Sequence, residues 1–533
     1  MQVLIANEMR LLDAMAADEY GMPGVVLMEG AGIALANAVE SLYGPLSGKR
    51  IAICCGGGNN GGDGWAAARH LALRGARPEV LSLAAPGRMK GDAAIHAQAY
   101  AALRLPYKDS VEAGQLPELL QGFSLIVECL LGTGFKAPLR DEMLRAIDAL
   151  NGSGIPILSA DIPAGVHSDT GHVAGNAVHA AQTVTFAYPK PGLFLPPGDS
   201  CAGGLLIDPI GYLWDNLKHE STIALTSLWD ARGELLVWPR TAKTLLQKRR
   251  SNTNKSDYGH VFVIGGSRGM AGAPTLSALA AQRAGAGLVT VMTAESVQGQ
   301  IAAKCLEQMT VPLPEKAGCI SKDALLLVKE KLQNATLACI GPGLGEGAGE
   351  FVQELLSSLP CSLVLDADGL NALASNPSCL NLGAHTLVIT PHPGEAARLL
   401  GCTISEIEED RIGSACKLAS RYGAIAVLKG SRTIIADPTG RVRVNGTGNA
   451  GMATGGSGDV LTGIVGALVA RALTMRKNQG DTTVDMLDVV ALAVCIHGLA
   501  GDLHASRHGE AGLIASDIID ELPQAHKKLE GLI

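Results

Sequence analysis

Hydrophobic and polar positions follow two rhythms along the chain. Between residues 1 and 40, apolar residues recur at helical spacing, which predicts an opening helical layer. Short apolar or β-branched runs then end in glycine or a turn, and each is followed by an Ala- and Leu-rich stretch of helical pattern. Strands that alternate with helices indicate parallel βαβ units, and therefore an α/β fold. Ligands of such sheets bind beyond the carboxyl ends of the strands, where these glycines fall.

This alternation stops between residues 205 and 255 and resumes at "GHVFVIGGS". We therefore predict two α/β domains, at 1–215 and 236–533, joined by a linker at 216–235. No repeat unit links the two halves. Two apolar segments of the second half, 464–473 and 489–501, suit either a core or a subunit interface, and a homo-oligomer is the expected assembly.

Composition and charge narrow the class of protein. The 533 residues are 47% hydrophobic and 18% charged, with a net charge of −8, so the basic footprint of a nucleic-acid-binding protein is missing. Glu8, Arg10 and Asp13 stand where a secretory signal would be apolar. No stretch reaches the ~18 uncharged apolar residues of a membrane span. We expect a cytoplasmic protein without a membrane or nucleic-acid partner. The 12 cysteines include no Cys-x-x-Cys, which favours reduced core thiols.

The stretch "ATGGSGDVLTG" at 453–463 is the first candidate for chemistry. Gly455, Gly456 and Gly458 leave the mouth of a predicted helix without side chains, and the unpaired N–H groups there attract an anion. Asp459 then has two interpretations. It accepts a proton from an attacking hydroxyl, or it is an ordinary first-turn residue that stabilises the helix dipole.

Three further segments of the second half carry polar residues with two interpretations each. "VLKGSRTII" predicts two strands around a tight turn at Lys429, either a phosphate clamp or a plain hairpin. His392 stands between two prolines. It either contacts a ligand or is part of a turn at the start of a helix. Asp366 and Asp368 stand at the end of a predicted buried strand. They either lie beside a phosphate or a metal ion, or they cap a helix.

Taken together, six ordered motifs at 265–289, 341–345, 365–371, 390–395, 428–430 and 449–463 resemble the ADP/ATP-dependent NAD(P)H-hydrate dehydratases of the ribokinase-like fold. The resemblance covers most of 240–525. It implies that the dinucleotide substrate touches Ala273, Gly343, His392 and Asp459. It implies that ADP or ATP, with Mg²⁺, lies against Lys429, Gly430, Ser431, Arg432, Thr433, Gly455, Gly456, Ser457 and Gly458. The sequence departs from the family at two positions. Ala450 stands where proline is commoner and Met270 where an aromatic residue is frequent, which predicts altered packing against the ligand.

The first half has its own glycine-rich stretch, "CGGGNNGGDG" at 55–64. Its two asparagines and its aspartate are not needed by an ordinary redox fold, and no Gly-x-Gly-x-x-Gly opens a helix after the first strand. The amides of Asn59 and Asn60 suit an ion or the phosphate and amide groups of a ligand. The alternative is a Gly- and Asn-rich turn selected for its backbone conformation alone.

With "VECLLGTGFKAPL" at 127–139 and "SADIPAGVHSDTG" at 159–171, this stretch resembles the NAD(P)H-hydrate epimerase domain over about 10–210, which implies a Rossmann-like, three-layer αβα fold. The resemblance implies potassium held by Asn60, Glu128 and the backbone of Ala164. It implies dinucleotide contacts at Asn59, Asn60, Gly61, Gly62, Asp63, Gly132, Thr133, Gly134, Phe135, Lys136, Ala137, Pro138 and Asp161. Glu128 replaces the usual aspartate and Ala164 the usual serine, two departures that change the groups around the ion. Asp161 shuttles a proton or caps a helix.

These resemblances predict an enzyme that repairs hydrated NADH and NADPH. One domain interconverts the R and S hydrates, and the other dehydrates the S hydrate through a phosphorylated intermediate, using ADP or ATP. The alternative function is a ribokinase-like vitamin or sugar kinase that keeps its phosphorylated product, fused to a Rossmann-like binding module. Related folds occur in an mRNA-decapping scaffold protein, but the intact "NNGGD" and Asp161 argue against a module without catalysis.

Overall fold

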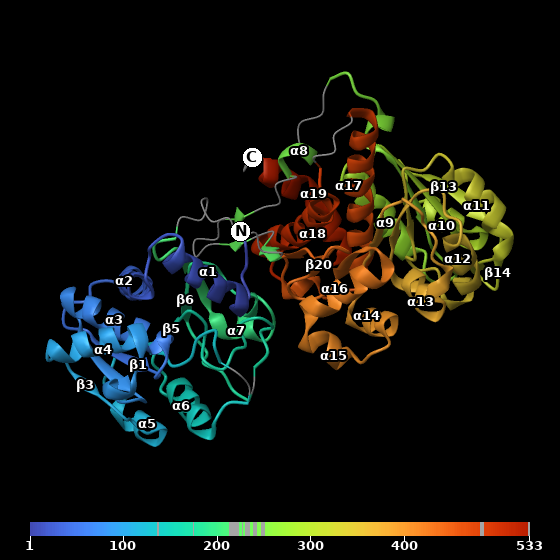
Figure 1. Cartoon of the computed structure of the whole chain (residues 1–533). Helices are drawn as coiled ribbons and strands as arrows, with labels where there is room; N and C mark the ends of the chain where they lie inside the picture. Colours follow the sequence, from blue (N-terminus) through green and yellow to red (C-terminus); the bar gives the residue numbers. More distant parts are fainter. Residues whose placement is uncertain are drawn as a thin grey trace. The chain divides into compact units, whose positions relative to one another are not determined.

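The computed structural model describes residues 1–135, 138–173, 175–212, 223–225, 228–229, 235–237, 242–246, 251–479 and 484–530 (Figure 1). The chain forms two compact units, one built on Gln2–Ser221 and the other on Leu235–Ile533. Within the predicted linker 216–235, strand β8 (Ile223–Leu225) pairs with β21 (Val442–Val444) of the second unit. Most of the remaining linker residues lie outside the described part of the chain, so its limits stay a prediction.

The first unit is a seven-stranded parallel sheet in the order β3-β2-β1-β4-β5-β6-β7. Its strands are β1 (Arg50–Cys55), β2 (Arg77–Ser82), β3 (Tyr107–Lys108), β4 (Leu125–Cys129), β5 (Ile157–Ala160), β6 (Gln182–Phe186) and β7 (Gly204–Asp208). Its helices are α1 (Ala6–Asp18), α2 (Gly24–Tyr43), α3 (Asn59–Leu73), α4 (Gly91–Ala102), α5 (Leu116–Leu119), α6 (Asp141–Gly152) and α7 (Gly198–Ala202). The predicted opening helical layer is therefore confirmed.

Alternation along β1 shows how both faces of this sheet are covered. Ile51 and Ile53 belong to the core cluster that contains the buried residues of α2, α3 and α4. Ala52 and Cys54, which point the opposite way, belong to the cluster that contains Ile147 and its neighbours on α6. Because successive side chains of a strand alternate between faces, a strand buried on both sides must be apolar throughout. The predicted three-layer αβα arrangement is confirmed.

The stretch at 55–64 differs from the expected loop, because helix α3 already begins at Asn59. The reason is close packing of this helix against the sheet. A Cβ on Gly61 would lie 2.0 Å from the carbonyl oxygen of Gly56, and one on Gly64 would lie 2.7 Å from the sulfur of Cys55. The glycines therefore let the first turns of the helix approach the end of β1.

The second unit has a ten-stranded sheet in the order β13-β12-β11-β16-β17-β18-β19-β20-β21-β8. The strands not yet given are β11 (His260–Ile264), β12 (Leu288–Ala294), β13 (Met309–Leu313), β16 (Leu337–Ile340), β17 (Ser362–Leu365), β18 (Leu387–Ile389), β19 (Ile425–Leu428) and β20 (Ile434–Ala436). The strands from β13 to β19 are parallel, whereas β20 runs antiparallel to both of its neighbours. The strand–turn–strand predicted around Lys429 is thus confirmed as the hairpin of β19 and β20.

The helices of this unit include a long buried pair. All its α-helices in the described residues are α8 (Ala242–Leu245), α9 (Gly272–Arg283), α10 (Glu295–Ala302), α11 (Leu325–Leu332), α12 (Gly349–Leu356), α13 (Ala367–Ser375), α14 (Pro393–Leu400), α15 (Ile404–Glu409), α16 (Arg411–Tyr422), α17 (Ser457–Gln479), α18 (Met486–His508) and α19 (Ala515–Glu530), and the long pair is α17 and α18. By length and composition alone, α2, α17 and α18 are apolar enough to cross a membrane, although each contains charged residues. The most apolar windows of α17 and α18 are 72% and 78% buried within the protein. Both are core helices, which resolves the core-or-interface question for most of 464–473 and 489–501.

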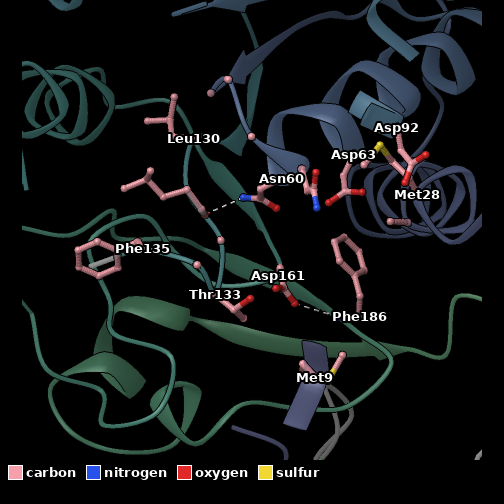
Figure 2. A pocket seen from close by; sticks show the side chains of 18 of the residues that line it. Met9, Met28, Asn60, Asp63, Asp92, Leu130, Thr133, Phe135, Asp161 and Phe186 are labelled. Atoms are coloured by element: carbon pink, nitrogen blue, oxygen red, sulfur yellow. Dashed lines mark hydrogen bonds between the residues drawn. The ribbon is translucent and has the colours of Figure 1, made fainter. Parts of the chain in front are cut away.

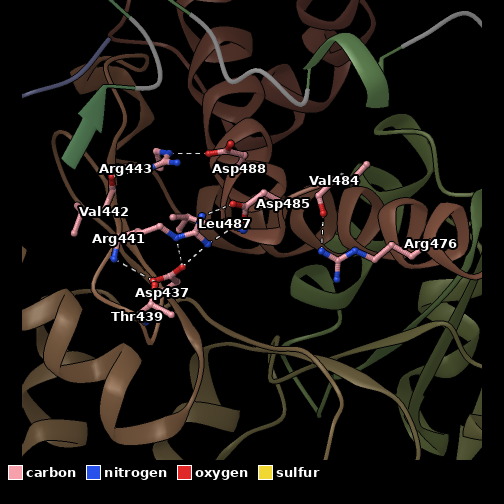
Figure 3. A network of polar contacts seen from close by, with 10 residues as sticks. All are labelled: Asp437, Thr439, Arg441, Val442, Arg443, Arg476, Val484, Asp485, Leu487 and Asp488. Carbon is pink, nitrogen blue, oxygen red and sulfur yellow. Dashed lines mark hydrogen bonds and ion pairs between the residues drawn. The ribbon is translucent and has the colours of Figure 1, made fainter. Parts of the chain in front are cut away.

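A polar network fastens the end of the sheet to α18 (Figure 3). Arg441, just before β21, pairs with Asp437 at 2.6 Å and also with Asp485, which caps the start of α18. On β21 itself, the Nε of Arg443 donates to Asp488 at 2.7 Å. All 12 cysteines are free thiols and nine of them are buried, so most are core residues, as predicted.

Candidate active sites

The first unit holds a cavity of about 690 Å³ at the carboxyl ends of β1 and β4. The chain order of the sheet reverses between these two strands, which is where ligands of open α/β sheets bind. Figure 2 shows the side chains of Asn60, Asp63 and Asp161 around one space. The predicted residues that line it are Asn59, Asn60, Asp63, Gly132, Thr133, Gly134, Phe135 and Asp161.

Other predicted residues of this site have different surroundings. Gly61 and Gly62 face protein rather than the cavity, since a Cβ on Gly62 would meet the sulfur of Met28 at 2.5 Å. Pro138 does not belong to the cavity lining. Lys136 and Ala137 lie outside the described residues.

Asp161 follows β5 with a φ of 65°, a backbone conformation that few non-glycine residues adopt. No helix begins there, so the interpretation of Asp161 as a helix cap is wrong. Its Oδ1 accepts from Thr185 Oγ1 at 3.2 Å, from Phe186 N–H at 3.3 Å, and from the Nζ of Lys190. The tertiary structure thus ties the end of β5 to the end of the neighbouring strand β6.

Three more carboxyl groups line the same cavity, those of Asp13, Asp63 and Asp92, and burial raises the pKa of two of them. Burial, followed by the negative charge of Asp161, raises the pKa of Asp63 well above its usual value, although Lys190 opposes this. Burial also raises the pKa of Asp13, against a 2.8 Å hydrogen bond from Tyr212. Carboxyl groups whose pKa values are raised by burial in a cavity are typical of sites that move protons.

The three predicted potassium ligands meet around one loop. Asn60 Nδ2 donates to the carbonyl oxygen of Leu131 at 2.7 Å, while its buried Oδ1 has no hydrogen-bond partner among the described residues. The fully buried Glu128 accepts from Leu130 N–H at 2.8 Å and from Ala164 N–H at 3.2 Å. Burial raises its pKa to about 7, although these hydrogen bonds oppose the shift. The Ala164 carbonyl accepts from another backbone N–H at 2.9 Å. Of these three residues, Asn60 alone presents an oxygen without a hydrogen-bond partner in the described part of the chain.

The second unit holds a cavity of about 810 Å³ at the mouth of α17. Gly456, with a φ of 91°, turns the chain into this helix, and Ser457 and Gly458 open its first turn. The nearest atom to a Cβ on Gly458 would be Lys429 Nζ, at 3.5 Å. Bare backbone and one ammonium group thus face the same space, as the anion-site interpretation requires.

The predicted nucleotide residues mostly line this cavity. The lining includes Lys429, Gly430, Ser431, Arg432, Thr433, Gly456, Ser457 and Gly458, together with the predicted substrate residues His392 and Asp459. Gly455 does not belong to the lining, although open space surrounds the position of its Cβ. The hairpin turn and the glycine-rich turn, far apart in sequence, therefore enclose one cavity.

Asp459 lies in the first turn of α17 and lines the cavity. Burial raises the pKa of its carboxyl group to about 7, and the negative charge of Asp366 adds to the shift, whereas Lys429 opposes it. The backbone carbonyl of Asp459 accepts a 2.8 Å hydrogen bond from Ser277 on α9. A carboxyl group poised near neutral pH has the property that a general base needs.

Asp366 and Lys429 form a buried ion pair beneath this loop. Lys429 Nζ lies 2.8 Å from Asp366 Oδ1 and 3.7 Å from Glu395. The other oxygen of Asp366 accepts from Thr462 of α17 at 2.7 Å. Burial opposes ionisation of Asp366, but the charge of Lys429 and these hydrogen bonds prevail and lower its pKa. Asp366 therefore anchors α17 to the end of β17.

The remaining predicted residues have clear positions. His392 is the N-cap of α14, and its Nδ1 accepts from Gly394 N–H at 3.0 Å, which confirms the helix-entry turn. Ala273 and Gly343 lie together, since a Cβ on Gly343 would approach the Ala273 Cβ to 3.1 Å. Neither belongs to the lining of the cavity at α17, so their contact with substrate stays a prediction. Asp368 accepts from Gly345 N–H at 2.8 Å.

Two site residues were not identified from the sequence. Lys190 lines the first cavity, and its only signal was a lysine just after the strand "QTVTF". His497 lines the second cavity, where its Nε2 lies 3.0 Å from the carbonyl oxygen of Ser457. Burial lowers the pKa of His497 to about 4, so it is neutral and donates to that carbonyl. A lone histidine within an apolar helix was the available signal.

Comparison with known proteins covers both units. A family model described as NAD(P)H-hydrate dehydratase matches residues 261–524, and one described as YjeF-related protein N-terminus matches residues 24–192. A Bacillus subtilis structure described as ADP/ATP-dependent NAD(P)H-hydrate dehydratase, co-crystallised with ATP and Mg²⁺, is 28% identical, with a TM-score of 0.44. The match covers 54% of this chain and 97% of that chain.

Two curated relatives match nearly the full length, and each is named bifunctional NAD(P)H-hydrate repair enzyme Nnr. The protein of Moorella thermoacetica is 40% identical over 99% of this chain and 97% of its own length. That of Escherichia coli is 35% identical over 98% of this chain and 93% of its own. Both resemblances stated from the sequence are confirmed, and both units have the predicted α/β class. The chain belongs to the family of bifunctional NAD(P)H-hydrate repair enzymes.

Proposed function

We propose that this chain restores hydrated NADH and NADPH with two active sites, an epimerase in the first unit and a dehydratase in the second. The observation that carries the proposal is Asp459, a carboxyl group poised near neutral pH at a glycine-lined helix mouth. The family membership supports the same pairing of activities. The epimerase makes every hydrate molecule available to a dehydratase that accepts only the S form.

In the dehydratase, each part of the cavity has one task. A bound ADP or ATP with Mg²⁺ supplies the phosphoryl group that makes the hydroxyl of the hydrate a good leaving group. Asp459 takes the proton of that hydroxyl. The backbone N–H groups around Gly456 and Gly458 hold the transferred phosphoryl, and Lys429 adds positive charge beside them. Loss of phosphate, assisted by the ring nitrogen, and of a proton from the next ring carbon then restores NAD(P)H.

Lys429 is already paired with Asp366 and Glu395, which keeps its ammonium group in a defined position. Burial alone would lower its pKa, but these two carboxylates outweigh burial and raise it. The ammonium group therefore stays charged at every working pH. His497 holds the first turn of α17 through the carbonyl of Ser457, which fixes the direction of the free N–H groups.

In the epimerase, the two hydrates differ only at the carbon that bears the hydroxyl. The C–O bond must therefore break, assisted by the ring nitrogen, and re-form on the other face of the ring. Asp161 is the proposed proton shuttle for the departing and returning oxygen. The apolar groups around it in the cavity, including Phe186 and Met9, limit the access of bulk water.

The residues fit the metal ions unequally. No group of three or more His, Cys, Asp or Glu side chains among the described residues forms a metal site, so Mg²⁺ would be held largely by the phosphates of the nucleotide. For potassium, the unpartnered Oδ1 of Asn60 fits a cation, whereas Glu128 and Ala164 already make hydrogen bonds. Potassium therefore remains a proposal that rests on Asn60, and no catalytic step is assigned to it.

The proposal is tested by supplying a mixture of R and S hydrates, with ADP and then with ATP, and following the reduced-nicotinamide absorbance. We expect full recovery of NAD(P)H and one free phosphate per molecule. The same assay with Na⁺ in place of K⁺ tests the potassium site. A stable phosphorylated product without recovered absorbance would instead identify a ribokinase-like kinase.

The pH dependence of the dehydratase follows from the raised pKa of Asp459, which is about 7. Because a base must be ionised to accept a proton, kcat/KM should fall about tenfold for each pH unit below that value and level off above it. The measurement is a pH profile of kcat/KM with pure S hydrate and saturating nucleotide. A profile that stays flat between about pH 5.5 and 8 would contradict the assignment.

A further inference from the structure

The first cavity contains a charged residue with no task in the epimerase as described so far. Lys190 lies after β6, and only 1% of its side chain is exposed although it lines the cavity. A buried ammonium group is costly unless it is fully paired and hydrogen-bonded. This burial beside the proposed substrate pocket calls for an explanation.

The three N–H groups of the Lys190 ammonium have three acceptors. They are a carboxylate oxygen of Asp161, the carbonyl oxygen of Phe186 at 2.9 Å, and the hydroxyl oxygen of Thr185 at 3.2 Å. An ammonium group has three donors and no acceptor, so this set uses its full capacity. Lys190 is therefore already satisfied within the protein, and it has no donor left for a substrate.

The contacts of Asp161 are divided between its two oxygens. Oδ1 accepts from Lys190, from Thr185 and from the N–H of Phe186. Oδ2 accepts no hydrogen bond from the residues that the structure describes, and the residue lines the cavity (Figure 2). One oxygen is anchored, while the other is left to receive a proton.

We propose that Lys190 is the positioning residue of the epimerase, which holds Asp161 by Oδ1 and keeps Oδ2 directed at the substrate. The inference rests on the proposed role of Asp161 as the proton shuttle. Lys190 also supplies the positive charge next to Asp161, in a cavity whose lining has three further carboxyl groups, Asp13, Asp63 and Asp92, and one further cation, Arg10. Without the neighbouring ammonium group, the carboxylate of Asp161 would be unfavourable beside these acidic groups.

The first test replaces Lys190 with methionine, which keeps the length of the side chain but not its charge. We expect the epimerase kcat to fall about 10²-fold, the size typical of lost electrostatic preorganisation, with less than threefold change in KM. The groups that face Asp161 are Lys190, Asp63 of α3, and Asp13 of α1, itself bonded to Tyr212. The acidic limb of the pH–rate profile should move to higher pH, because these carboxylates then lack the neighbouring ammonium group that favours their charged forms.

The second test restores the charge from solution. Lys190→Ala should lose a similar factor in kcat and regain at least tenfold when small alkylammonium ions are added, because the site opens to the cavity. Lys108→Met, an exposed lysine of the same domain, is the matched control and should change neither activity. The dehydratase rate with pure S hydrate reports that the remainder of each variant is intact.

Several outcomes would overturn the inference. They are a Lys190→Met rate within threefold of the original, or a rate loss with neither a shifted pH profile nor recovery with amines. If melting curves show that both Lys190 variants fail to fold, Thr185→Val decides. That variant removes the hydroxyl group that contacts both Asp161 and Lys190. An unchanged epimerase rate would contradict the proposal. If Asp161→Asn retains full rate, the proposed shuttle itself fails, which is a distinct result.

Discussion

Asp459→Asn is expected to lower dehydratase turnover by about 10²–10⁴, the usual contribution of a positioned general base. An amide has nearly the size of the carboxylate but cannot accept the hydroxyl proton. The side chain lies in the first turn of α17, and the Asp459 contact to Ser277 uses its backbone carbonyl, which the substitution leaves unchanged. The helix and the phosphate-binding turn should therefore survive. Steady-state kinetics with pure S hydrate and ADP measure the effect.

The KM for nucleotide and the affinity for the hydrate should change little, since the predicted loss concerns proton transfer. Asp520→Asn, on the exposed side of α19, is the matched control for loss of one carboxylate in the same domain. The epimerase activity of the same chain serves as an internal reference. Near-normal turnover by a folded Asp459→Asn protein would remove this residue from the mechanism.

Asp161→Asn is expected to lower the epimerase rate by about 10²–10⁴ and to leave dehydration of pure S hydrate unchanged. The amide oxygen can still accept from Lys190 and Thr185, so the packing at the end of β5 is retained. Its amide nitrogen cannot take a proton from the substrate. With a mixture of hydrates, recovery of NAD(P)H should halt at the S fraction and continue only as fast as spontaneous epimerisation.

Asp109→Asn, exposed in the same domain, should give full recovery at the original rate. The melting curve separates loss of the proton shuttle from loss of stability, because only an unfolded first domain would change that curve. Complete and rapid recovery by Asp161→Asn would exclude this carboxyl group as the proton shuttle.

Much of the fold could be predicted because it depends on residues close together in sequence. Apolar runs that end in glycine indicated the parallel strands, and helical spacing indicated α1 and α2. The turn at Lys429 and the helix entry at His392 follow from glycine and proline, which restrict the backbone locally. The start of α3 was missed, because its glycines serve packing against β1 rather than a flexible loop.

The chemistry of the two sites was only partly accessible in this way. The sequence by itself determined the two α/β domains, the glycine-lined mouth before Asp459, and the family. Only the tertiary structure decided that Lys190 bonds Asp161. It also decided that Asp366 bonds both Lys429, 63 residues away in the chain, and Thr462, 96 residues away. The order of strands in a sheet creates such contacts, and burial then sets their charge states, whereas local patterns report only on near neighbours along the chain.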